Sequence, residues 1–136
     1  MVILNEEMDV LISIKPVYVN EIRLGKKKYE FRKRVFKKNV KNIYIYESAP
    51  VKKIIGFFPY TGYLSDTPSV LWEECQPYSG IGKSSFFQYF KEKSVGYAIK
   101  VDSFQPLDPP LDPKDVFNTF TAPQSYMYIA KGYLKR

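Results

Sequence analysis

The stretch of sequence that decides the fold is residues 10–34, which reads VLISIKPVYVNEIRLGKKKYEFRKR. It opens on the β-branched, apolar run Val10–Ile14, which predicts a buried strand. Pro16 follows, and proline suits the first turn of a helix because its missing N–H has no helical partner there. We therefore expect a short helix over Pro16–Leu24 that ends at Gly25, a residue typical of a helix C-terminal cap.

The end of this stretch, Lys28–Arg34, alternates between aromatic and charged residues. In a strand, the aromatic side chains would lie on one face and the charged ones on the other, namely Lys28, Glu30, Arg32 and Arg34. Lys27 stands just before this strand. The pattern predicts a half-buried strand with a charged exposed face. That face either binds phosphates through arginine forks and lysine charges or is a solvated edge protected from aggregation.

The remaining sequence contains more strand patterns than helix patterns. We expect strands at 42–47, 53–63, 96–101 and 125–129, short helices at 70–74 and 84–91, and a loop rich in proline and aspartate at 102–115. Because the strands do not alternate with long helices, we expect an α+β or mainly β fold, a small mixed or antiparallel β-barrel with short flanking helices. A chain of 136 residues fits a single domain, 1–136.

Basic residues are concentrated in one segment. The chain has 21 Lys and Arg against 14 Asp and Glu, a formal charge of +7. The segment 26–41 holds nine basic residues and a single acid, Glu30, so that the rest of the chain is nearly neutral. Such a segment most often binds a polyanion, usually nucleic acid, although a solvated basic face is the alternative.

Composition excludes several kinds of chemistry. The chain has no histidine and one cysteine, Cys75, which excludes Ser-His-Asp and Cys-His catalysis, histidine metal sites and an internal disulfide. Gly82-Lys83-Ser84 has the ending of a phosphate-binding P-loop, but Pro77 stands where that motif needs its first glycine. No apolar run reaches the roughly 18 residues of a transmembrane helix. We expect a cytoplasmic protein without a metal, a cofactor or a membrane partner.

Several blocks of the sequence resemble the ASCH domain family, and its prokaryotic and phage members in particular. Ser13-Ile14-Lys15-Pro16 matches the family's Ser-Ile-x-Pro block, and residues 25–32 match its Gly-x-Lys-x-x-Glu-x-Arg signature. Later blocks at 78–81, 96–99 and 123–125 fit the same family, so the resemblance spans almost the whole chain. It implies a PUA-like β-barrel of about five or six strands. It also implies a basic cleft beneath the helix that precedes the signature.

The resemblance implies a role in RNA biology. ASCH proteins are viewed as RNA-binding or RNA-modifying modules; some are amidohydrolases of acetylated cytidine, and others cleave RNA. In the amidohydrolase branch the family uses its signature lysine, matched here by Lys27, a threonine at the position of Glu30, and a distant glutamate. Our leading hypothesis is an RNA- or nucleotide-binding domain, with regulation of RNA or transcription as one role open to it.

Two alternatives remain open from the sequence. One is a hydrolase, either a ribonuclease or an amidohydrolase of a modified cytidine nucleoside, in which Lys27 and Glu30 are catalytic. The other is a regulator that acts through protein partners. For the leading hypothesis, the ligand is single-stranded RNA or a nucleotide-like molecule. The candidate binding residues are Ser13, Lys15, Lys27, Glu30, Arg32, Arg34, Tyr46, Gln124, Ser125 and Tyr128.

Overall fold

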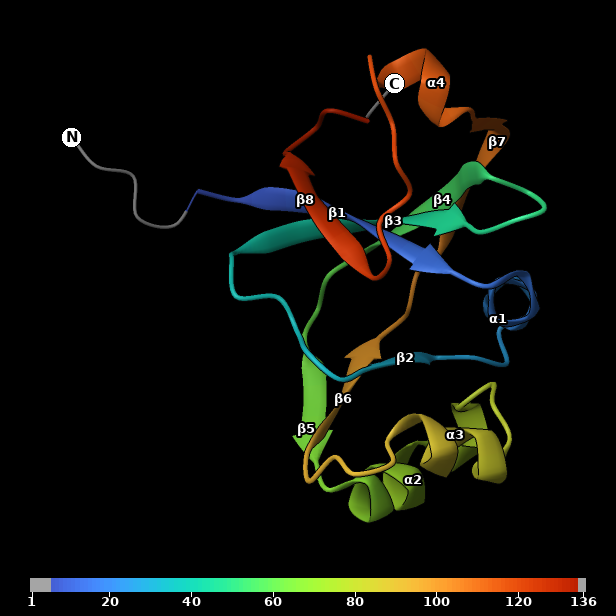
Figure 1. Ribbon diagram of the computed structural model, residues 1–136, viewed down its shortest axis with the longest axis vertical. Helices are drawn as coiled ribbons and strands as arrows, with labels where there is room; N and C mark the ends of the chain where they lie inside the picture. The colour runs from blue at the N-terminus through green and yellow to red at the C-terminus, as the bar shows by residue number, and fades with distance from the viewer. Residues whose placement is uncertain (1–5, 135–136) are drawn as a thin grey trace.

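The computed structural model describes residues 6–134 (Figure 1). In chain order, the described residues form β1 (Met8–Ile14), α1 (Pro16–Arg23), β2 (Tyr29–Arg32), β3 (Val40–Glu47), β4 (Lys53–Pro59), β5 (Tyr63–Asp66), α2 (Pro68–Cys75), the 3₁₀ helix η1 (Gln76–Tyr78), α3 (Lys83–Tyr89), β6 (Gly96–Lys100), β7 (Gln105–Leu111), α4 (Pro113–Val116) and β8 (Tyr126–Ala130).

The strands are arranged in two sheets. The five-stranded sheet has the order β7-β4-β3-β1-β8, and the three-stranded sheet has the order β2-β6-β5. The pair β1–β3 is parallel and the other pairs are antiparallel. The predicted α+β class with mixed strand pairing and short flanking helices is confirmed. Backbone pairing among the described strands does not join the two sheets, so closure into one barrel stays a prediction, as does the single domain over residues 1–136.

The segment expected to be one strand at 53–63 is divided between the two sheets. β4 ends at Pro59 and β5 begins at Tyr63. Gly62 lies between them with φ +117°, a conformation that an L side chain rarely adopts. The chain therefore leaves the larger sheet and enters the smaller one at this point.

The prediction of a loop at 102–115 was wrong. This segment contains the strand β7 (Gln105–Leu111) and the short helix α4 (Pro113–Val116). Proline cannot donate to a central ladder, but it is tolerated on an edge strand, where one side needs no partner. β7 is such an edge, because among the strands of residues 6–134 it pairs only with β4. The proline content indicated irregular backbone where the structure has a sheet edge.

Within the described part of the chain, three apolar clusters hold these layers together. One lies on the face of the larger sheet that meets β6, with Ile12, Ile45 and Ile99 among its fully buried members. A second covers the opposite face of the larger sheet, around Leu11 and Ile54, where the region of α4 packs. The third joins the smaller sheet to α2 and α3, which lie beneath it in Figure 1. No described helix is long and apolar enough to cross a membrane.

The strand β2 is buried on both faces, which corrects the expectation of an exposed charged face. Glu30 and Phe31 point to opposite sides, yet each is only 6% exposed. Phe31 enters the cluster of α2 and α3, with its ring centroid 4.9 Å from that of Phe86. Glu30 lies on the other side of the strand, where its charge is met by the cations Lys27 and Arg32. The charged side of β2 is therefore part of the interior surface of a cleft.

Candidate functional site

A cleft of about 1130 Å³ lies where β1, α1, β2 and α3 meet the segment before β8. Five cationic side chains and one carboxylate, Glu30, line it. Nine of the ten predicted binding residues lie on this cleft, namely Ser13, Lys15, Lys27, Glu30, Arg32, Arg34, Tyr46, Gln124 and Ser125. The structure therefore brings together residues that are more than a hundred positions apart in the sequence.

The end of β1 holds the C-terminal wall of the cleft in place. The Ser13 hydroxyl donates to the carbonyl of Pro123 at 2.6 Å, and the Ser13 backbone N–H donates to the carbonyl of Ser125 at 3.0 Å. Lys15 follows directly as the N-cap residue of α1, so its exposed side chain is placed at the mouth of the cleft. The Ser-Ile-Lys-Pro block thus couples one wall of the cleft to the other.

Arg32 is held rigidly by four hydrogen bonds. Its Nε and Nη2 donate to Oε2 of Glu30 at 3.1 and 2.6 Å, and Nη2 also donates to the carbonyl of Ser13 at 2.8 Å. Its Nη1 donates to the Ser125 hydroxyl at 3.1 Å. A guanidinium has five N–H groups, so one on Nη1 has no partner among residues 6–134. The Ser125 hydroxyl accepts from Arg32 and keeps its own hydrogen to donate.

Lys27 is buried in the wall of the cleft, with a side chain that is 2% exposed. Its Nζ donates to the carbonyl of Ser79 at 2.7 Å and lies 3.7 Å from Oε1 of Glu30. The rings of Phe31 and Tyr18 flank the ammonium, with centroids 4.8 and 5.2 Å away. Burial lowers the pKa of Lys27 below its usual value; the Glu30 carboxylate opposes this shift and the nearby guanidinium adds to it.

The cations exposed in the cleft are Lys15, Lys33 and Arg34. Lys33 was missed by the sequence analysis, because strict alternation places it on the face opposite to Glu30. The strand ends at Arg32, so the alternation no longer applies at position 33. The Lys33 ammonium lies 4.7 Å from the centroid of the Tyr89 ring.

The aromatic residues of the cleft differ from those predicted. Tyr46 lines the cleft but is only 6% exposed, and its ring contacts that of Phe120 with a centroid distance of 5.3 Å. Tyr128 does not line the cleft; its hydroxyl accepts from the backbone N–H of Lys37 at 2.9 Å. The accessible rings instead belong to Tyr18, Tyr89 and Tyr126.

Ser79 and Gly80 belong to one of the blocks that resemble the family, but their contact with Lys27 was missed. No local pattern predicts it, since the acceptor is a backbone carbonyl 52 positions away. Within residues 6–134, no group of three or more His, Cys, Asp or Glu side chains is placed to hold a metal ion.

The chain was compared with known proteins. No family model matches it. An ASCH domain-containing ribonuclease from Zymomonas mobilis is 28% identical over 129 residues, which covers 93% of this chain and 87% of that protein. The crystal structure of the ASCH protein from Zymomonas mobilis superposes with a TM-score of 0.83 at 26% identity, covering 94% of this chain and 90% of the other. Structures of its tyrosine-to-phenylalanine and serine-to-alanine variants have TM-scores of 0.83 and 0.82 at 26% and 25% identity, each covering 95% of this chain and 94% and 92% of the other.

The fold and the cleft define a small α+β protein in which two sheets and the short helices α1 and α3 frame an interior surface rich in cations. Similarity over nearly the full length, in both sequence and structure, identifies the class more closely. The chain is similar to ASCH domain proteins in both sequence and structure, and this similarity supports its membership of that family.

Proposed function

We propose that this protein binds single-stranded RNA in the cleft and cleaves it as a ribonuclease. The observation that carries the proposal is the restrained Arg32 guanidinium, which keeps one free N–H beside the free hydroxyl hydrogen of Ser125. The relative from Zymomonas mobilis that matches this chain is named a ribonuclease, which supports the same activity.

Arg32 and Ser125 form a site suited to one phosphate. Two donors 3.1 Å apart can hydrogen-bond two oxygens of the same phosphate group. Because Glu30 and the Ser13 carbonyl already restrain the guanidinium, little side-chain entropy is lost when it binds. Glu30 thus acts as the orienting partner of Arg32, while its Oε1 remains directed toward Lys27.

The mouth of the cleft suits the flanking parts of a single strand. Lys15, Lys33 and Arg34 are exposed and can contact adjacent phosphates. Tyr89 is 36% exposed, and its ring offers a stacking surface for an unpaired base. In an A-form duplex the bases are stacked on each other and cannot reach such a ring, so the cleft favours single strands.

Lys27 is suited to accept a proton because burial lowers the pKa of its amine. In the neutral form, one N–H still donates to the Ser79 carbonyl, and the lone pair can take the proton of a ribose 2′-hydroxyl. The 2′-oxygen then bonds to phosphorus to give a cyclic phosphate, and the bond from phosphorus to the 5′-oxygen breaks. That oxygen takes a proton from water in the open cleft, and the hydroxide left behind takes the proton held by Lys27. Arg32 stabilises the negative charge on the phosphate oxygens during this step.

The amidohydrolase alternative finds less support in the geometry. The branch that acts on acetylated cytidine has a threonine at the position of Glu30, whereas the Glu30 carboxylate is held by two hydrogen bonds from Arg32. A carboxylate in this arrangement provides no hydroxyl nucleophile. We therefore keep acetylated cytidine as a test substrate and not as the proposed one.

The test uses a fluorescently labelled single-stranded RNA, with binding followed by anisotropy and cleavage by denaturing gel. Acetylated cytidine is incubated in parallel. The variants are Lys27→Ala and Lys27→Met, and the matched control is Lys26→Ala, which removes the same charge from an exposed neighbour outside the cleft. We expect both Lys27 variants to lose cleavage by about 10²–10⁴-fold while RNA binding changes little.

Three results would contradict the proposal. The absence of RNA binding even at low salt would contradict RNA as the ligand. Cleavage that survives in both Lys27 variants would contradict the role of Lys27 as the proton acceptor. Deacetylation of acetylated cytidine without RNA cleavage would favour the amidohydrolase instead.

A further inference from the structure

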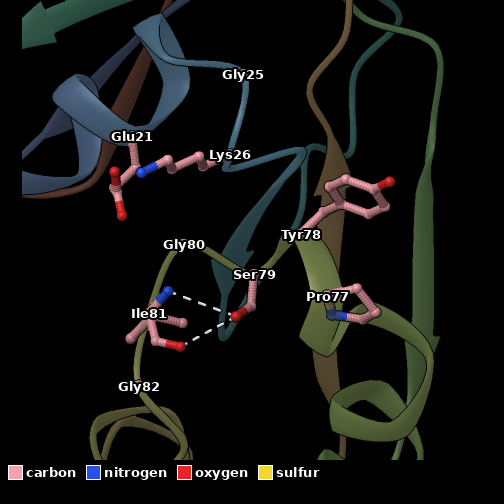
Figure 2. A pocket seen from close by; sticks show the side chains of 9 residues that line it. All are labelled: Glu21, Gly25, Lys26, Pro77, Tyr78, Ser79, Gly80, Ile81 and Gly82. Carbon is pink, nitrogen blue, oxygen red and sulfur yellow. Dashed lines mark hydrogen bonds between the residues drawn. The ribbon is translucent and has the colours of Figure 1, made fainter.

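The segment between α2 and α3 separates the cleft from a second, smaller pocket. That pocket has a volume of about 480 Å³ and lies between the end of α1 and residues 77–82 (Figure 2). Ile81 lines both the pocket and the cleft. We call residues 77–82 the partition, because Ile81 within them lines both cavities. Lys27 is a cleft residue that packs against the partition.

Gly80 lies directly on the aliphatic part of the Lys27 side chain. A Cβ atom placed on Gly80 would approach Cβ, Cγ and Cδ of Lys27 to 2.5, 2.7 and 2.9 Å. These distances are shorter than carbon atoms tolerate, so only glycine allows the backbone to come this close. Gly80 also has φ +63°, in the left-handed region.

The residue before it binds the other end of the same side chain. The carbonyl of Ser79 accepts from the Lys27 Nζ at 2.7 Å. Two consecutive residues of the partition therefore contact Lys27 along its length, Gly80 at the stem and Ser79 at the amine.

The partition is itself restrained by hydrogen bonds. The Ser79 hydroxyl lies 3.2 Å from the carbonyl of Gln76. It also lies 3.0 Å from the carbonyl of Ile81 and accepts from the Ile81 N–H at 3.5 Å (Figure 2). The carbonyl of Tyr78 accepts from the backbone N–H of Lys28 at 2.8 Å, which ties the partition to the start of β2. A restrained backbone can impose a fixed position on the side chain that it contacts.

We propose that Ser79 and Gly80 are positioning residues, which hold the Lys27 amine out of water and beside Glu30 at the wall of the cleft. The role of this amine in RNA cleavage rests on the proposed function. The position itself is a property of the protein without RNA.

Among the described residues, the titratable and charged groups that face the Lys27 amine come from three elements. Glu30 and Arg32 face it from β2, the Tyr18 ring from α1, and the Cys75 thiol from α2. Burial is the largest influence on the amine and lowers its pKa. If the stem of Lys27 is pushed away from the partition, the amine reaches water and its pKa returns toward the usual value of 10.5.

Gly80→Ala tests the proposal, with Gly25→Ala as the matched control. Gly25 has φ +74°, and nothing lies within 4 Å of a Cβ placed on it, so this control introduces similar backbone strain without the collision. The Lys27 titration is followed by NMR of the side-chain Cε resonance in protein with ¹³C-labelled lysine. We expect Gly80→Ala to raise the midpoint toward 10.5, and Gly25→Ala to leave it unchanged.

Ser79→Ala provides a second variant in case Gly80→Ala does not fold. It retains the carbonyl that binds Lys27 but removes the hydroxyl that restrains the partition. We expect a smaller rise of the midpoint, and the pH profile of RNA cleavage should move in the same direction. An unchanged midpoint in the folded variants, or equal shifts at Gly80 and Gly25, would overturn the proposal. A protein that cleaves no RNA but shows the shift would contradict the proposed function alone.

Discussion

Replacement of Glu30 by glutamine should cost far more stability than the same replacement at the surface. The Glu30 side chain is 8% exposed and faces two cations, Lys27 and Arg32, whose side chains are 2% and 12% exposed. Breaking a buried ion pair by removing one partner costs about 3–5 kcal/mol, because an uncompensated charge remains in the interior. Glutamine keeps one carbonyl oxygen for Arg32, so we expect a loss near the lower limit, about 3 kcal/mol.

The matched control is Glu7→Gln, because Glu7 pairs with Lys131 at 3.3 Å on the surface. The side chains of that pair are 36% and 50% exposed, and exposed pairs contribute about 0–1 kcal/mol. Urea unfolding can be followed by the fluorescence of the single tryptophan, Trp72. With a slope of about 1.5 kcal/mol/M, Glu30→Gln should lower the midpoint by about 2 M. Equal losses below about 1 kcal/mol in both variants would refute the buried network.

Three further predictions follow from the same contacts. Burial lowers the pKa of Lys27 in the folded protein, so the unfolded chain binds more protons in the window between that lowered pKa and the usual value of 10.5. The contribution of this group to stability therefore rises with pH across that window. The free energy of unfolding of the wild type minus that of Lys27→Met, measured by urea unfolding, should increase as pH increases. Lys33→Ala should reduce the slope of log affinity against log salt for single-stranded RNA by about 0.7, whereas Lys114→Ala, which is outside the cleft, should leave the slope unchanged. Burial raises the pKa of the Cys75 thiol to about 11, so mass spectrometry should detect alkylation by iodoacetamide at about pH 8 only after unfolding; rapid labelling of the folded protein would contradict the buried position.

The sequence predicts the first half of the fold well, because its signals there are local. The apolar run before Pro16 and the glycine at position 25 mark β1 and α1 closely, and Gly25 has the left-handed φ of +74° that such a cap requires. Strand β7 was missed because its prolines are acceptable only at an edge. Whether a segment becomes an edge depends on the order of strands in the sheet, which no local pattern contains.

In the candidate site, too, the sequence predicts local relations between residues but not contacts between distant segments. The spacing of Glu30 and Arg32 correctly placed both on one face of a strand, because that relation spans two residues. The contacts of that face with Ser13 in β1 and with Ser125 just before β8 join segments far apart in the sequence. The two tyrosines of β8 show where prediction from alternation fails. Alternation places Tyr126 and Tyr128 on one face, but only the first reaches the cleft.

The most direct test of the account is an NMR titration of the ¹⁵N-labelled protein with a single-stranded RNA of about eight nucleotides, within the site size of known single-strand binders. We predict that the backbone amide signals of Ser13, Lys33 and Ser125, which line the cleft, shift together as RNA is added. The signals of Lys114 and Asp115 in α4 should remain in place, because α4 does not line the cleft. Shifts confined to α4, or none at all at low salt, would contradict the claim that this cleft binds RNA.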